Sequence, residues 1–426
     1  MGVFLVYDVR SNNDAGVSRY GLSLLGPAAR ALRKAGWRIS VVSRPEQKER
    51  AEEAVNGLDV PVTCAPDEEE GFVRRSPWLS QMLISERVDL YFTSHYVVDR
   101  DCPVPFVFTV HDLTRLRMPQ FSYTDATFTA RFGDRQFALI RRELEELTAW
   151  DKPQGDEEFF TRYFRAVTRY LTHRAAGIVT VSRSSASDIE SMLEVSAERL
   201  AIVPGGVDRQ IFAPHPELDF RPVLARYGLS GPYLMFVGLT HPNKRFLWLL
   251  EQLLARRAEL PSGVKLVAVG GHAENTPGVA ELLNSYRAED FVRFTGRVSD
   301  ADLAALYGGA SALVIASVSE GSNLPALEAV ACGCPVVATD IPALREILGD
   351  AASYYDPASG TELARLAAAA LAGQLRGGAG ACRPPSWTES GQQLARVLSR
   401  AVREQGGASG SGTDATLALS GRPHPG

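Results

Sequence analysis

The chain has 426 residues, 45% of them hydrophobic and 22% charged, which is ordinary for a soluble globular protein of two or three domains. Its formal net charge of −5 excludes a broadly basic surface for nucleic acids and leaves open a weak, local membrane contact. We find neither a signal-peptide pattern nor a run of about 18 apolar residues, so we expect a cytoplasmic protein without a transmembrane segment. The five cysteines lack paired zinc-ligand spacing and are expected to be free thiols.

Strand and helix patterns alternate along the first 205 residues. Residues 2–8 form a continuous apolar run, typical of a strand buried on both faces, and residues 17–34 carry apolar positions at helical spacing. Short polar links between such elements indicate βαβ units and a parallel sheet. Further strands are predicted at 37–43, 88–93, 106–110 and 177–182, with a helix at 184–193. We interpret a long segment with helical stretches, at about 119–170, as an insertion over this first domain.

A second strand–helix series begins at residue 232, after a mixed, loop-like stretch. Strands are predicted at 233–237, 265–270, 292–295, 312–316 and 335–339, with helices at 246–256, 300–307 and 324–331. The fold class is therefore α/β, with two domains facing across a cleft. The expected divisions are a first domain at 1–205, a second at 206–386, a helix at 387–405 and a disordered Gly/Ser-rich tail at 406–426. Parallel sheets bind ligands at the carboxyl ends of their strands, so we expect the site in the cleft.

The common cofactor fingerprints are missing from the sequence. The first strand–turn–helix has a single glycine, Gly16, where the G-x-G-x-x-G of a dehydrogenase needs three. Neither the P-loop pattern, nor H-E-x-x-H, nor G-x-S-x-G occurs. No cofactor is expected, and no metal-binding D-x-D stands at a strand end, so no metal is expected either.

One segment combines a phosphate-binding element with two carboxylates. A predicted strand ends at residue 316, a glycine-containing loop follows, and a helix begins near Leu324 with Pro325 in its first turn. The unpaired amides of a helix start, with the positive end of its dipole, form a natural phosphate site. Glu320 precedes this helix start and Glu328 lies about one turn inside, where carboxylates can accept hydrogen bonds from sugar and ribose hydroxyls.

The residues 319–340 (S-E-G-S-N-L-P-A-L-E-A-V-A-C-G-C-P-V-V-A-T-D) resemble the E-x7-E region of the retaining glycosyltransferases of family 4. Five other motifs resemble that family in the expected order, at 109–113, 181–182 with 202–208, 236–244, 294–300 and 387–390. The resemblance covers most of residues 1–405. It implies the GT-B fold, which has two Rossmann-like domains and a C-terminal helix that crosses back to the first domain.

The resemblance also implies roles for residues around a nucleoside diphosphate sugar. Glu328 would hold the ribose hydroxyls, Glu320 a hydroxyl of the transferred sugar, and Lys244 the leaving phosphate, with His111 beside the sugar. The implied catalytic residues are His111, Lys244 and Glu320. The implied donor-binding residues are Gly16, Arg245, Arg297, Val298, Gly321, Ser322, Asn323, Leu324 and Glu328.

The stretch after Gly238 departs from the family pattern. Many members carry an arginine there, whereas this chain has Leu239, Thr240 and His241. The second positive charge at the diphosphate would then come from His241 or Arg245, or the phosphate would be held less tightly.

The implied activity is retaining transfer of a hexosyl group, of the mannosyl, glucosyl or N-acetylglucosaminyl type, to a hydroxyl of a glycan or small-molecule acceptor. No motif supplies a carboxylate nucleophile, which favours acceptor attack on the face that the diphosphate leaves. A GT-B-like partner subunit that binds without catalysis, or a GT-B epimerase or phosphorylase, are the alternatives. The Ala/Gly/Arg-rich composition is typical of a high-GC bacterium.

Overall fold

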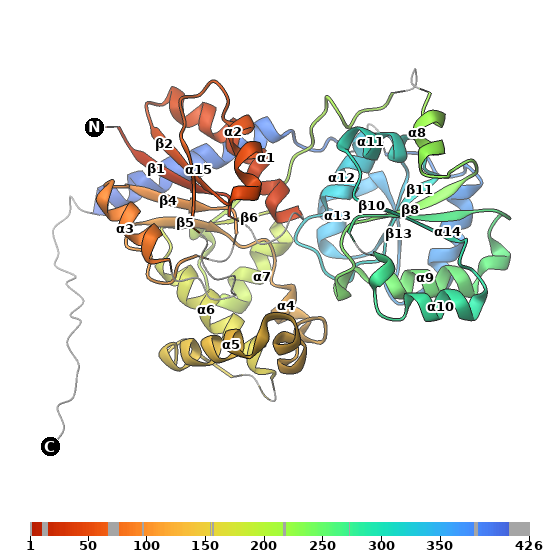
Figure 1. Ribbon diagram of the computed structural model, residues 1–426, viewed down its shortest axis with the longest axis horizontal. Helices are drawn as coiled ribbons and strands as arrows, with labels where there is room; N and C mark the ends of the chain where they lie inside the picture. Colours follow the sequence, from red (N-terminus) through yellow and green to blue (C-terminus); the bar gives the residue numbers. More distant parts are fainter. Residues whose placement is uncertain are drawn as a thin grey trace.

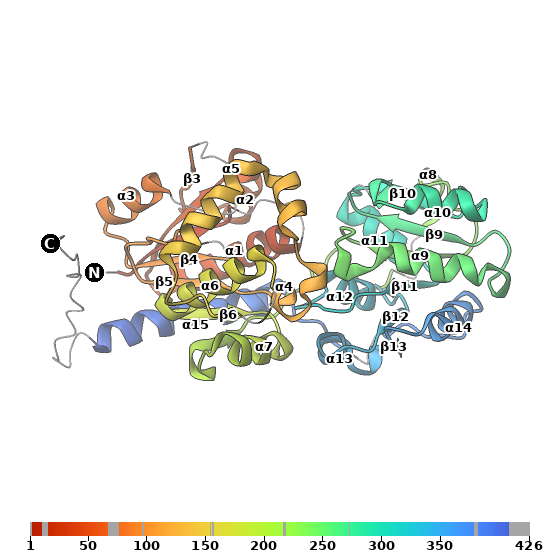
Figure 2. The ribbon, with the colours of Figure 1, turned by 90° about the horizontal axis from the view of Figure 1, so that it is seen from below.

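The computed structural model describes residues 2–10, 16–66, 76–95, 98–153, 155, 157–215, 219–271, 273–378 and 382–408. Two lobes lie side by side, and each is built on one sheet with helices packed around it (Figure 1 and Figure 2). In both sheets every pair of neighbouring strands is parallel.

The first sheet has seven strands in the order β3-β2-β1-β4-β5-β6-β7. Its strands are β1 (Phe4–Asp8), β2 (Arg38–Ser43), β3 (Val62–Cys64), β4 (Leu90–Thr93), β5 (Phe106–Thr109), β6 (Gly177–Thr180) and β7 (Leu200–Ile202). The central strands β1, β4 and β5 are buried along their whole length. Helices cover both faces of such a sheet, which explains why these strands are continuous apolar runs rather than alternating ones.

The second sheet has six strands in the order β10-β9-β8-β11-β12-β13. Its strands are β8 (Tyr233–Val237), β9 (Lys265–Val269), β10 (Val292–Gly296), β11 (Ala312–Ile315), β12 (Val336–Thr339) and β13 (Ala352–Tyr355). Apolar side chains of β8 and β11 point into two separate buried clusters, one on each face of the sheet. The second lobe therefore has a core of its own.

The helices follow the same division. The first lobe contains α1 (Gly16–Lys34), α2 (Lys48–Ala54), α3 (Pro77–Ser85), α4 (Thr114–Arg117), α5 (Asp125–Glu146), α6 (Phe159–Arg174) and α7 (Arg183–Leu193). The second lobe contains α8 (Arg221–Arg226), α9 (Phe246–Ala255), α10 (Val279–Tyr286), α11 (Asp300–Gly309), α12 (Leu324–Ala331), α13 (Pro342–Leu348) and α14 (Gly360–Leu371), and α15 (Trp387–Ala408) follows.

Helix α15 returns to the first lobe and packs along α1 (Figure 1). Leu394 and Leu398 are fully buried in the same apolar cluster as α1. The helices approach closely at Gly391, where an added Cβ would lie 2.4 Å from Cβ of Pro27. Beside this crossing, the amide of Val207 donates to the carbonyl of Pro385 at 2.8 Å, so the two connections between the lobes run together.

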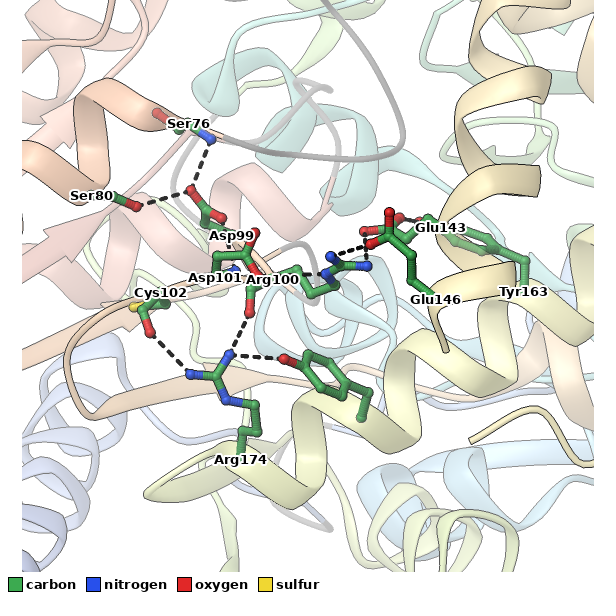
Figure 3. Close-up of polar contacts among 11 residues, drawn as sticks. Ser76, Ser80, Asp99, Arg100, Asp101, Cys102, Glu143, Glu146, Tyr163 and Arg174 are labelled. Carbon is green, nitrogen blue, oxygen red and sulfur yellow. Dashed lines mark hydrogen bonds and ion pairs between the residues drawn. The ribbon is translucent and has the colours of Figure 1, made fainter. Parts of the chain in front are cut away.

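The predicted insertion, at about 119–170, contains α5 and most of α6, and a polar network attaches these helices to the rest of the first lobe (Figure 3). Asp99 accepts a hydrogen bond from the amide of Ser76, at the start of α3, at 2.8 Å. The next residue, Arg100, forms an ion pair with Glu146 on α5. Arg174, at the end of α6, donates to the carbonyl oxygens of residues 100 and 102. The loop at 99–102 therefore links three helices.

The α/β class, the two Rossmann-like sheets and the returning C-terminal helix are confirmed. The stretch that was expected to be loop-like before residue 229 contains the short helix α8. Nine further elements were not predicted: β3, β7, β13, α2, α3, α4, α10, α13 and α14. Residues 406–408 belong to α15 rather than to a tail, and residues 409–426 lie outside the described residues. All five cysteines are free thiols. No helix in the described ranges is long and apolar enough to cross a membrane.

Candidate functional site

Each sheet has one point where its strand order reverses, between β1 and β4 in the first and between β8 and β11 in the second. The loops that leave the carboxyl ends of strands at such a point diverge and leave a crevice, where ligands of α/β proteins bind. In the second sheet these loops hold Lys244, after β8, and Glu320, after β11. The topology thus brings together two predicted site residues that are 76 positions apart.

Lys244 and Glu320 form a partly buried ion pair. The lysine Nζ lies 2.5 Å from Glu320 Oε1, and the two side chains are 24% and 5% exposed. Asn323 donates its side-chain amide to the same carboxylate oxygen at 3.0 Å. Asn243 holds the two loops in register, since its backbone carbonyl accepts from Val318 and its side chain donates to the carbonyl of residue 319. A cation and a carboxylate are therefore held together at the carboxyl ends of β8 and β11.

Helix α12 begins directly beside this pair because its local sequence specifies a helix start. Asn323 is the N-cap, and its side-chain oxygen accepts from the amide of Ala326 at 3.0 Å. Pro325 occupies the first turn, where its missing N–H costs no helical hydrogen bond. The predicted donor residues Gly321, Ser322, Asn323 and Leu324 form this helix start. Its amides and dipole can bind an anion next to Lys244.

Glu328, one turn along α12, is 3% exposed, so it is not a surface helix residue. The pKa of Glu328 is raised to about 7, chiefly by burial and also by the negative charge of Asp300, against the opposing effects of Arg19 and of the Tyr307 hydroxyl. Arg19 Nη2 lies 3.3 Å from Glu328 Oε1, and the hydroxyl of Tyr307 lies 3.4 Å from Oε2. A buried carboxylate with oriented partners is suited to bind ligand hydroxyls.

Arg19 and Asp300 belong to the candidate site by their contacts with Glu328 and with each other, and the sequence did not single them out. The guanidinium of Arg19, on α1, donates to both oxygens of Asp300 at 3.0 and 3.1 Å and lies 5.4 Å from the ring centroid of Phe212. The only signal in the sequence is a basic residue three positions after Gly16, which places it one helical turn past the predicted first-domain loop.

Arg297 and Val298 lie between β10 and α11, directly before the helix that carries Asp300 and Tyr307. Val298 packs against the core of the second lobe, whereas Arg297 is exposed. This position places them on the side of Glu328, not of Glu320. The predicted site residues of the second lobe therefore extend from Lys244 past the start of α12 to this loop.

His111 follows β5 and faces the site from the first lobe. Its Nε2 lies 2.8 Å from the carbonyl oxygen of Ser94, and its ring makes an edge contact with Tyr20 at 5.0 Å. Burial lowers the pKa of His111 below its ordinary value. A carbonyl only accepts hydrogen bonds, so the neutral ring carries its proton on Nε2 and its acceptor on Nδ1.

The two lobes touch at the predicted donor loop. A Cβ on Gly321 would lie 2.2 Å from the carbonyl oxygen of His111, so only glycine allows this approach. Beside it, the hydroxyls of Thr114 and Ser319 lie 2.8 Å apart. Glu346 on α13 accepts hydrogen bonds from the first two amides of α7, at 2.7 and 2.9 Å. The described conformation therefore brings His111 against the loop that carries Glu320.

Two predicted donor-binding residues, Arg245 and Gly16, remain to be placed. The guanidinium of Arg245 donates to the carbonyl of Pro357 at 2.7 Å and stacks 3.7 Å from the Trp248 ring centroid, so it is committed within its own lobe. Gly16 begins α1, and a Cβ there would meet no atom within 4 Å. The rest of the preceding loop, at 11–15, lies outside the described residues.

Within the part of the chain that the structure describes, no group of three or more His, Cys, Asp or Glu residues could hold a metal ion. The expectation that the protein needs no metal or other cofactor stays a prediction, because the chemistry of the bound donor decides it.

Sequence comparison identifies two family models along the chain. Residues 27–211 match the model of Glycosyltransferase Family 4, and residues 231–372 match that of Glycosyl transferases group 1. The chain is 31% identical over 215 residues to O-antigen chain mannosyltransferase B of Escherichia coli, covering 50% of this chain and 56% of that protein. It is 32% identical over 228 residues to the MMP alpha-(1->4)-mannosyltransferase of Mycolicibacterium hassiacum, covering 52% of this chain and 51% of that protein. The chain thus matches about half the length of these curated relatives.

Structural comparison extends the likeness over both lobes. Anabaena HepE, solved in complex with UDP and glucose, aligns with 96% of this chain and 100% of its own, at a TM-score of 0.62 and 16% identity. WaaG, a glycosyltransferase involved in lipopolysaccharide biosynthesis, aligns at a TM-score of 0.56 and 14% identity. This alignment covers 94% of the present chain and 98% of WaaG. At these identities the likeness establishes the shared GT-B fold. With both lobes matched by its family models, the chain belongs to the group 1 glycosyltransferases of family 4.

Proposed function

We propose that the protein is a retaining glycosyltransferase that moves a hexosyl group from a nucleoside diphosphate sugar to an acceptor hydroxyl. The observation that carries the proposal is the Lys244–Glu320 ion pair at the strand-order reversal, beside the start of α12. Glu328 lies one turn beyond it. The cation and the helix start are suited to bind a diphosphate. The carboxylates on either side are suited to bind a sugar and a ribose through their hydroxyls.

The donor diphosphate would lie at the start of α12, with Lys244 on its β-phosphate. Binding would separate the lysine from Glu320, which would then accept a hydroxyl of the sugar instead. Lys244 would stabilise the charge that develops on the leaving diphosphate, the kind of electrostatic contribution that is worth about 10²–10³ in turnover. His111, neutral and oriented by Ser94, would accept a hydrogen bond from the sugar through Nδ1.

In the proposed step the acceptor hydroxyl attacks the anomeric carbon from the face that the diphosphate leaves. The bond from that carbon to the phosphate oxygen breaks, and the bond to the acceptor oxygen forms. The proton of the acceptor hydroxyl passes to the departing diphosphate, and the products are the glycoside and the nucleoside diphosphate. Glu320 and Glu328 act as binding groups here rather than as an acid–base pair.

A mannosyl donor is the first choice, since the curated relatives named above are mannosyltransferases. The acceptor would be bound by the first lobe with α5 and α6. The test incubates the protein with GDP-mannose, UDP-glucose, UDP-N-acetylglucosamine and ADP-glucose, and measures release of the nucleoside diphosphate in the presence of candidate acceptors. We expect release from one donor, a product that keeps the anomeric configuration by NMR, and unchanged activity in the presence of chelator.

A matched pair of variants makes the test specific. Glu320→Ala should abolish transfer, whereas Gly231→Ala, at an exposed position where a Cβ meets nothing within 4 Å, should not. Unchanged turnover in Glu320→Ala would show that transfer does not depend on Glu320. A wild type that binds a nucleotide but releases none from any donor would favour a binding subunit without catalysis. A product of inverted configuration would refute retention.

A further inference from the structure

Arg19 lies on the first lobe, but the charged and aromatic groups that surround its guanidinium belong to the second. Its two terminal nitrogens form a fork on the carboxylate of Asp300, at 3.0 and 3.1 Å. One of them, Nη2, also lies 3.3 Å from Oε1 of Glu328. The guanidinium plane lies near the ring of Phe212, at 5.4 Å. A side chain of α1 thus contacts charged side chains of both α11 and α12.

From this geometry we propose that Arg19 is a positioning residue for the donor: it aligns the Glu328 carboxylate for the ribose and ties the first lobe to it. The inference rests on the proposed function. Ribose binding would then depend on the relative position of the two lobes, because Arg19 belongs to the first lobe and Glu328 to the second.

The hydrogen-bonding capacity of Glu328 supports this role. An ionised carboxylate offers about four lone-pair sites. Among the described residues, Arg19 lies against one of its oxygens and the hydroxyl of Tyr307 against the other. This leaves about two sites, which matches the two hydroxyls of a ribose. Arg19 can occupy its site without displacing the ligand, because the bidentate grip on Asp300 holds the guanidinium to one side.

The charge state of Glu328 also depends on Arg19. Protonation would convert one acceptor oxygen into a donor and weaken its hold on a ribose diol. The groups facing Glu328 are Arg19 from α1, Asp300 and Tyr307 from α11, and Cys332 at the end of its own helix. Of these, Arg19 and Tyr307 lower the pKa of Glu328, while burial and Asp300 raise it to about 7. Arg19 is the one cation among these groups, so its loss should move the titration to higher pH.

The experiment titrates GDP, UDP and ADP into the full chain from pH 6 to pH 9 by calorimetry and follows the nucleotide that binds. For the wild type we expect affinity to weaken as pH falls through about 7. In Arg19→Met the pH at which affinity is half lost should rise. The ratio of mutant to wild-type Kd should therefore be about tenfold larger at pH 7 than at pH 9. Arg19→Lys should bring this pH most of the way back to the wild-type value, because lysine keeps the positive charge.

Two further variants separate positioning from general damage. Arg30→Met makes the same change at an exposed position on the same helix and should leave both Kd and its pH dependence unchanged. In a Glu328→Gln background, Arg19→Met should no longer change the pH dependence, since the titrating group is gone.

The outcomes distinguish the inference from the function on which it rests. If the wild type binds none of the three nucleotides, the proposed function fails and this inference fails with it. If the wild type binds one of them but Arg19→Met weakens binding by the same factor at every pH, Arg19 is only a tether between the lobes. That result would overturn the inference and leave the proposed function intact.

Discussion

Replacing Gly321 by alanine tests whether the contact between the lobes is needed for turnover. The added Cβ would lie 2.2 Å from the carbonyl oxygen of His111 and 2.9 Å from its carbonyl carbon. Ordinary contact begins at 3.4 Å, and both obstructing atoms are backbone, so no side-chain rotation can relieve the clash. The backbone at Gly321 has no positive φ, so alanine itself introduces no local strain. The lobes must therefore separate by about 1 Å at this point, which is enough to reduce turnover about 100-fold.

The assay compares kcat, nucleotide Kd and thermal unfolding of Gly321→Ala with those of Gly231→Ala, where the added Cβ meets no neighbour. We expect kcat to fall by about 100-fold, because the groups of the two lobes no longer face each other at the required distance. The unfolding temperature should change little, because each lobe keeps its own core. Wild-type kcat in Gly321→Ala would show that the approach of His111 to the donor loop has no part in catalysis.

Four further substitutions test separate parts of the account. Lys244→Met should lower kcat by about 10²–10³-fold, measured as nucleotide release, with partial recovery in Lys244→Arg, because it removes the cation that we propose for the leaving phosphate. Asn323→Ala should reduce stability by about 1 kcal/mol in calorimetry, through loss of the α12 N-cap, and should weaken donor binding as well. Glu328→Gln should stabilise the protein by about 2–3 kcal/mol at pH 8 and hardly at all at pH 5. The reason is that the folded-state pKa of about 7 lies above the ordinary value of 4.5, so the wild type loses stability as pH rises through 7. Glu346→Ala should lower kcat several-fold and enlarge the radius of gyration in solution scattering, because it uncaps the first amides of α7 across the interface. Unchanged values in any of these assays would contradict the corresponding role.

Much of the fold could be predicted from the sequence because buried parallel strands leave a strong pattern. The apolar run that became β1 and the strand that became β8 were predicted within two residues of their observed bounds. Helix α8 and strand β7 were missed, because each is short and only partly buried and carries little periodicity. Residues 342–371, which contain α13, β13 and α14, were not assigned to elements.

The site could be predicted only within each lobe. The start of α12 follows from Asn323 and Pro325, and Lys244 approaches Glu320 because strand order brings β8 beside β11. Contacts between lobes depend on how the two sheets are placed, which no local pattern encodes. Arg19 was therefore missed, although it lies next to Glu328. Arg245 has a different reason: its contact with Pro357 lies within the second lobe but joins residues 112 positions apart, and its sequence position beside Lys244 gave no sign of it.

A crystal structure of the protein with the nucleoside diphosphate that binds it would test the central claim most directly. The account predicts the diphosphate at the start of α12, with Lys244 within hydrogen-bonding distance of the β-phosphate and no longer paired with Glu320. Both ribose hydroxyls should lie against the Glu328 carboxylate. A nucleotide bound elsewhere, or at this place with its ribose turned away from Glu328, would contradict it.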